Sequence, residues 1–164
     1  MIIFAGDICN MASAYAYDTY VDAFKSVFGE KMPVVQIIMG NHDYYGRGTP
    51  ENCRRLFTRK IGTSPFTHYT VNGFHFIGVS PDCAKMSDGY RKILPYLKNE
   101  IEIAKKECGD RPIFVTTHNS PENTVYGSDD WGDKSLFDAF SQYHNVVNFA
   151  GHTHYSLLDE RSVW

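Results

Sequence analysis

Four apolar runs of the sequence each end directly at a polar residue whose side chain could bind a cation. In chain order, the runs and the residues that follow them are "MIIFAG" with Asp7, "VQIIMG" with Asn41 and His42, "IFVTT" with His118, and "VVNFAG" with His152 and, two residues later, His154. In open α/β sheets, ligands bind outside the carboxyl ends of the strands. The repeated pattern therefore predicts that these distant residues meet at one edge of a sheet.

The side chains gathered in this way offer a carboxylate, an amide oxygen and several imidazoles. Such a set suits a borderline divalent ion such as Mn, Fe or Zn, whereas the lack of a thiolate argues against a structural zinc site. A glycine precedes Asp7, Asn41 and His152. Because glycine has no Cβ, it lets the chain turn sharply and approach an ion closely.

Each motif alone has an ordinary structural explanation. A His-x-His sequence is often only a surface pair, and Asn-His-Asp often forms a turn through bonds between side chain and backbone. A lone His118 would more often be a hydrogen-bonded histidine at a strand end than a metal ligand. Four such motifs, each directly behind an apolar run, together favour a shared metal centre.

The spacing of apolar residues predicts strands that alternate with helices, which indicates a mixed α/β fold. Helices are expected over residues 14–29, 50–62, 90–108 and 133–143, with Pro95 moving the start of the third to a later residue. Besides the opening run, strands are expected over residues 33–39, 68–71, 74–80, 112–118 and 145–151, and residues 155–164 resemble the start of one more. The dipeptide Asn72-Gly73 predicts a tight hairpin between two of these strands.

Composition excludes several classes of partner. The net charge of −3 over 164 residues argues against a surface that grips a nucleic-acid duplex. No apolar run approaches the roughly 18 residues of a membrane span. The four cysteines form no C-x-x-C pair, which favours a reducing compartment such as the cytoplasm, with two disulfides as the alternative. The compartment is otherwise left open by the sequence.

The motifs "GDICN", "GNHD", "THNSP" and "GHTH" resemble, in order and spacing, those of the calcineurin-like metallophosphoesterases. The similarity extends over nearly the whole chain. It implies a four-layer α/β/β/α sandwich with two mixed sheets and two divalent metal ions (Mn, Fe or Zn) at the strand ends. It also implies hydrolysis of a small phosphorylated substrate, either a monoester or a diester, by a metal-activated water.

The resemblance further implies a role for each motif residue. Asp7 would bridge the two metals, Asn41, His118 and His152 would complete the second metal's ligands, and His154 would bind the first metal. His42 would face the leaving group, with Asp43 orienting it and Asn10 in support.

One family motif has no counterpart here. The family opens with an Asp-x-His motif on a strand before "GD", whereas Asp7 already belongs to the second motif. We therefore expect residues 1–164 to form a single metallophosphoesterase domain that is truncated at both ends, without its first strand and its C-terminal strands. The exposed sheet edges predict association of two copies. The alternatives are a hydrolase with one metal and a catalytically impaired scaffold.

Aromatic and polar residues follow the motifs, and we expect some of them to line the rim of the predicted metal site. Tyr44, Tyr45 and Arg47 follow "GNHD", and a long polar loop covers residues 119–132. Loops of that length are often functional. The residues that could wall a cleft are Asn119, Tyr126, Trp131 and Tyr155, with packing alone as the alternative for the aromatic ones. Arg47 could hold a phosphate, although a solvated loop arginine is an equal alternative.

Overall fold

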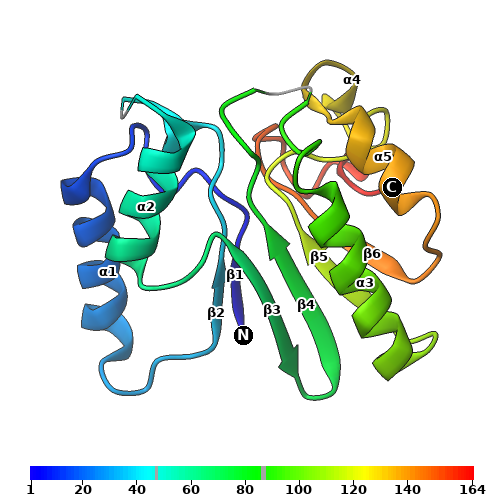
Figure 1. Cartoon of the computed structure of the whole chain (residues 1–164), viewed down its shortest axis with the longest axis horizontal. Coiled ribbons are helices and arrows are strands. Elements are labelled where there is room, and N and C mark those ends of the chain that lie inside the picture. Colours follow the sequence, from blue (N-terminus) through cyan, green and yellow to red (C-terminus); the bar gives the residue numbers. More distant parts are fainter. Residues whose placement is uncertain (47, 86–87) are drawn as a thin grey trace.

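Two β-sheets lie at the centre of the molecule (Figure 1). The structure, a computed structural model, describes residues 1–46, 48–85 and 88–164, so Arg47 lies outside the described residues. The smaller sheet pairs β1 (Ile2–Phe4) and β2 (Val35–Ile37) in parallel. The larger sheet is mixed and has the order β3 (Phe66–Val71), β4 (Phe74–Val79), β5 (Ile113–Thr116) and β6 (Val146–Phe149).

Helices cover the outer side of each sheet, which gives the predicted four layers (Figure 1). The smaller sheet is covered by α1 (Ala14–Phe28) and α2 (Pro50–Ile61), and the larger sheet by α3 (Leu94–Cys108) and α5 (Lys134–Phe140). The short elements are η1 (His42–Tyr44), α4 (Ser128–Trp131) and η2 (Glu160–Ser162). Within the described residues, no helix combines the length and the apolar character needed to cross a bilayer.

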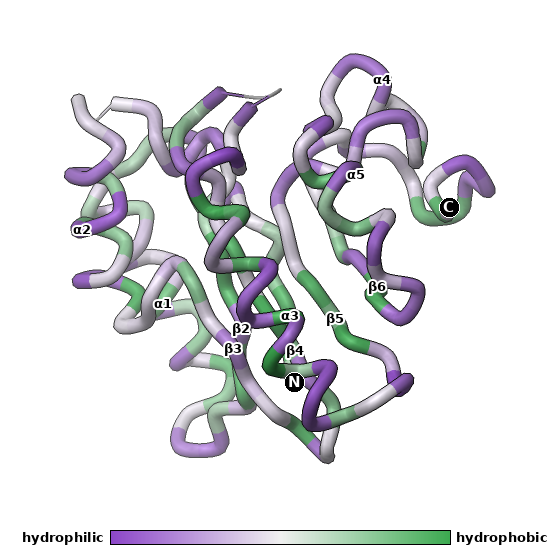
Figure 2. Tube along the Cα trace, turned by 45° about the vertical axis from the view of Figure 1, so that its right-hand side comes forward, coloured by the Kyte–Doolittle hydropathy of each residue, from purple (hydrophilic) through white to green (hydrophobic). Residues whose placement is uncertain are grey.

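Local sequence signals explain where these elements begin and turn. The side chains of Ser13 and Thr49 accept hydrogen bonds from backbone N–H groups and cap α1 and α2. Asn72 and Gly73 both have positive φ, as a type I′ hairpin requires, and they join β3 to β4 in antiparallel pairing. The predicted hairpin is thus confirmed. Figure 2 shows the hydrophobic stretches along β4 and β5, as expected for strands covered by helices.

The strands are shorter than the apolar runs that predicted them. The run over residues 33–39 contains only the three residues of β2, and the run over 112–118 contains only the four of β5. At their carboxyl ends, the two runs continue past the strands into the loops that carry Asn41 and His118.

The expectation of a strand over residues 155–164 is wrong. This segment forms the 3-10 turn η2 instead, because the Asp159 side chain accepts a hydrogen bond from the backbone N–H of Arg161. Leu157 and Leu158 are 84% and 97% exposed, so the apolar pattern in this segment does not reflect burial.

A buried glutamine links the two sheets. The side-chain amide of Gln36 on β2 donates to the Phe76 carbonyl at 3.0 Å and to the Thr67 hydroxyl at 3.3 Å. Its amide oxygen accepts from the Thr116 hydroxyl at 2.7 Å. Gly78 leaves room for this contact, since a Cβ there would lie only 2.7 Å from the Thr67 hydroxyl and 3.0 Å from the Gln36 side chain.

We expect Gln36→Met to destabilise the protein by about 1–3 kcal/mol, because it preserves side-chain length but leaves buried polar partners unsatisfied. Chemical denaturation measures the effect as a lower unfolding midpoint. The matched control is Gln142→Met, since Gln142 is exposed. Equal midpoints for the two variants would show that the polar link between the sheets contributes nothing to stability.

Candidate metal centre

The loops after β1 and β2 approach each other so closely that only glycine fits at two positions. A Cβ on Gly40 would lie 2.2 Å from a carboxylate oxygen of Asp7, and a Cβ on Gly6 would lie 2.7 Å from the His118 ring. Such distances are far below ordinary contact. The glycines before Asp7 and Asn41 therefore allow the close approach that the sequence predicts.

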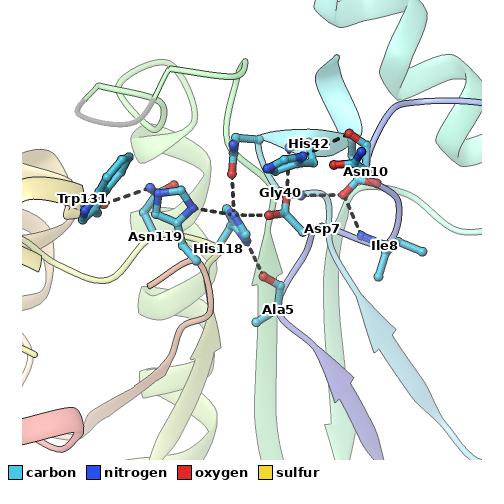
Figure 3. A network of polar contacts seen from close by, with 12 residues as sticks. Ala5, Asp7, Ile8, Asn10, Gly40, His42, His118, Asn119 and Trp131 are labelled. Carbon is cyan, nitrogen blue, oxygen red and sulfur yellow. Dashed lines mark hydrogen bonds and ion pairs between the residues drawn. The ribbon is translucent and has the colours of Figure 1, made fainter. Parts of the chain in front are cut away.

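Three of the predicted ligands come together at the strand ends. Asp7, His118 and His152 each offer a ligand atom, and these atoms lie within 4.8 Å of one another. The His118 Nε2 is 3.3 Å from a carboxylate oxygen of Asp7 and 3.1 Å from the Nδ1 of His152. Asn41 joins them, with its side-chain oxygen 2.9 Å from the His118 Nε2. Figure 3 shows Asp7 and His118 facing each other within this network.

The tautomer of His118 determines whether its Nε2 can donate a hydrogen bond to the neighbouring oxygens. Its Nδ1 lies 2.7 Å from the carbonyl oxygen of Ala5, which can only accept, so Nδ1 carries a hydrogen (Figure 3). In the neutral ring, Nε2 then presents a lone pair toward the side-chain oxygens of Asp7 and Asn41, which can only accept. A single extra proton could satisfy only one of these acceptors. A divalent cation would satisfy them all, so the donor set fits a metal ion.

Two further observations agree with this fit. The Nε2 of His152 is buried and lacks a hydrogen-bond partner among the described residues. Burial and the neighbouring His118 lower the pKa of His152 to about 4, which keeps the ring neutral at physiological pH. Burial raises the pKa of Asp7, but hydrogen bonds and charge from His118 and His42 outweigh it and leave that pKa below its ordinary value. Both groups are thus in the protonation state that binds metal.

Backbone strain is concentrated at the same residues. Among the described residues, positive φ occurs outside glycine at Asp7, His152, His154 and two asparagines. Outside glycine this conformation has a cost, and three of these five residues, Asp7, His152 and His154, are predicted ligands. Strain of this kind is typical of functional sites, where the surrounding structure holds it in place.

His42 lies beside the centre, at its partly exposed edge. Its backbone N–H donates to a carboxylate oxygen of Asp7 at 2.9 Å, and its ring Nδ1 lies 3.0 Å from the carbonyl oxygen of Asn10 (Figure 3). Because that carbonyl only accepts, Nδ1 carries the hydrogen and Nε2 remains available for a ligand.

The expectation that Asp43 orients His42 is not met. The Asn10 carbonyl holds the His42 ring, and the buried carboxylate of Asp43 accepts hydrogen bonds from other groups. These donors are the backbone N–H groups of Ile8 and Gly40, the Cys9 thiol and the Tyr17 hydroxyl. Burial raises the pKa of Asp43, while the bonds from these donors act in the opposite direction.

The other predicted residues lie around this cluster. His154 is exposed and is not one of the three clustered ligands, so its role as a ligand stays a prediction. Trp131 packs edge-on against His152 at 5.6 Å between ring centroids, and its carbonyl accepts from the Asn119 side chain (Figure 3). The rings of Tyr126 and Tyr155 stack on each other at 3.9 Å.

Two supporting groups were missed in the sequence. The hydroxyl oxygen of Tyr90 accepts from the backbone N–H groups of His118 and Asn119, which holds the loop after β5. The carbonyl of Ala5 sets the tautomer of His118. Neither has a motif, because a backbone carbonyl is present at every residue and the contact with Tyr90 is formed only by tertiary packing.

The layered α/β fold thus brings a cluster of oxygen and imidazole donors, which could hold a metal ion, to its strand ends. The chain matches the Calcineurin-like phosphoesterase family over residues 1–156. It therefore belongs to that family. A comparison with curated proteins gives no significant match.

We expect Asp7→Asn to weaken binding of Mn²⁺ by at least about tenfold, because it removes the only carboxylate of the cluster while preserving its shape. Isothermal titration calorimetry with Mn²⁺ measures the change. Asp138→Asn serves as control, since Asp138 lies on α5 with a 62% exposed side chain. Equal Mn²⁺ affinity for the two variants would contradict the assignment of Asp7.

Proposed function

We propose that this protein hydrolyses phosphate esters of small molecules, either monoesters or diesters. The observation that carries this proposal is the convergence of Asp7, Asn41, His118 and His152 on one point, with His42 beside it at the partly exposed edge. Membership of the calcineurin-like phosphoesterases supports the same class of reaction.

The four converging residues would hold a divalent ion, with Mn, Fe and Zn all compatible with oxygen and imidazole donors. Asp7 and His154 remain as ligands for a second ion. A bound ion would supply an activated water and stabilise negative charge on the phosphoryl oxygens. The chain's own contribution is to orient the donors: Ala5 sets the His118 tautomer, and the His42 N–H fixes the Asp7 carboxylate.

His42 is the proposed general acid. With Nδ1–H directed at the Asn10 carbonyl, only Nε2 is available to meet the departing oxygen. The protonated ring would donate from Nε2 to that oxygen as the P–O bond breaks. Asp43 contributes indirectly, because it holds together the two loops that carry Asp7 and His42.

A scaffold that binds a partner at this face, or a hydrolase with one metal, is the second candidate. The observation that favours these alternatives is that the cluster found among the described residues contains one Asp and two His side chains, Asp7, His118 and His152, without His154. The number of metal ions bound per chain separates the possibilities. Two ions support the main proposal, one ion supports the hydrolase with a single metal, and none supports the scaffold.

We expect His42→Ala to lower the rate of hydrolysis by about 10²–10⁴-fold for an ester with a poor leaving group, because the proton donor is lost. The loss should be smaller for a nitrophenyl ester, whose leaving group needs little protonation. Rates with phenyl and nitrophenyl phosphodiesters measure both effects, and calorimetry should show unchanged Mn²⁺ binding.

His144→Ala is the control for this experiment. His144 lies in the turn before β6, is not among the residues of the site, and has a 72% exposed side chain. The general-acid role is ruled out if His42→Ala hydrolyses both esters as fast as the parent chain.

Association of two copies through exposed sheet edges is the remaining part of the proposal. Among the described strands, β6 has one neighbour, and its residues Val147 and Phe149 are each 40% exposed. An apolar edge of this kind invites pairing with another chain. Light scattering at micromolar concentration should give the mass of a dimer or larger species, and a monodisperse monomer would contradict this expectation.

A further inference from the structure

The side-chain amide of Asn41 must adopt one orientation to bind metal. Its oxygen can bind a cation, whereas its NH₂ group has no lone pair to offer. In the structure the oxygen faces the centre, 2.9 Å from the His118 Nε2. In the metal-free site, however, the reversed amide could donate to that nitrogen. The inward orientation therefore needs a partner for the NH₂ group.

Tyr45 provides that partner. Its hydroxyl lies 2.9 Å from the Asn41 Nδ2, which donates to it. Asn41 is only 4% exposed, so few other acceptors can reach its NH₂ group. A buried N–H group without an acceptor is costly, which makes the Tyr45 hydroxyl energetically significant.

The surrounding backbone holds Tyr45 in this place. Asn41 and Tyr45 flank the 3-10 turn η1, with Asn41 at its N-cap and Tyr45 at its C-cap. The short turn keeps their side chains close enough for the hydrogen bond. The Tyr45 N–H donates to the His42 carbonyl at 3.1 Å, and the Tyr45 carbonyl accepts from the Ala12 N–H at 2.9 Å. The Tyr45 ring also packs against the His42 ring, with 4.8 Å between centroids.

We propose that Tyr45 is a positioning residue for the metal centre: its hydroxyl holds the Asn41 amide with the oxygen directed at the ion. This inference rests on the proposed function, because it takes Asn41 to be a metal ligand. In this role Tyr45 would act through Asn41 and would not itself be a ligand.

Tyr45→Phe tests the proposal, because it removes the hydroxyl and keeps the ring that packs against His42. We expect Mn²⁺ affinity, measured by isothermal titration calorimetry, to fall about 10–100-fold, as is typical when a residue that orients a ligand is lost. Tyr44→Phe is the matched control. This variant removes a buried hydrogen bond from the Tyr44 hydroxyl to the Pro81 carbonyl. The contact of Tyr44 with Asn41 is a backbone hydrogen bond, from the Tyr44 N–H to the Asn41 carbonyl, which the substitution keeps.

A second background separates positioning from general destabilisation. Asn41→Asp replaces the amide by a carboxylate, whose two oxygens can both bind metal, so orientation matters less. We expect Tyr45→Phe to cost less than half as much, in logarithmic affinity, in the Asn41→Asp background as in the parent.

The possible results are distinguishable. The proposal is supported if Tyr45→Phe lowers Mn²⁺ affinity in the parent chain and much less in the Asn41→Asp background. Equal losses in both backgrounds, or a loss shared by Tyr44→Phe, overturn it and leave the phosphoesterase function untouched. A parent chain that binds no Mn²⁺ overturns both the positioning role and the metal-dependent function.

Discussion

The buried carboxylate of Asp43 is the interaction on which the site depends. It accepts from the backbone N–H of Ile8 at 3.2 Å and of Gly40 at 2.8 Å, so one side chain joins the loop after β1 to the loop after β2. The Tyr17 hydroxyl, from α1, donates to the same carboxylate at 3.0 Å. An isolated buried carboxylate would be strongly unfavourable, and these donors offset that cost. The two loops are thereby held at a fixed separation.

This fixed separation is what forces the acceptor atoms together. Asp7 lies next to Ile8, and Asn41 lies next to Gly40, so the position of each ligand follows from the bonds to Asp43. Once the loops are joined, the oxygens of Asp7 and Asn41 have to face His118 across short distances. The lone pairs of these atoms repel one another, and a bound cation would offset that repulsion. The positive φ at Asp7 has a cost of its own, which the surrounding hydrogen bonds sustain.

Much of the fold and part of the site could be predicted from the sequence. Apolar runs that end in Asp7, His118 or His152 gave both the strands and the cluster, because parallel strands bring their carboxyl ends to one edge. The strand expected over residues 155–164 is absent from the structure, which shows how far an apolar pattern can be trusted. A single apolar run does not reveal whether a sheet edge lies beside it. The orienting role of Asp43 was implied by the family resemblance. In the structure its side chain accepts from Ile8 and Gly40 instead, since a side chain's direction is fixed by tertiary packing that a motif does not encode.

The origin of the ligands adds a further constraint. Asp7 and Asn41 follow the smaller sheet, whereas His118 and His152 follow β5 and β6 of the larger one. The centre therefore lies where the two sheets meet, and its geometry is only as precise as the packing between them. Gln36 sets that packing through its bonds to three strands of the larger sheet. An ion bound by ligands from both sheets would act as a second link between them. Because it would bind the folded chain alone, it would add to stability by an amount that grows with the logarithm of its affinity. Metal binding and sheet packing are thus coupled: whatever separates the sheets separates the ligands as well.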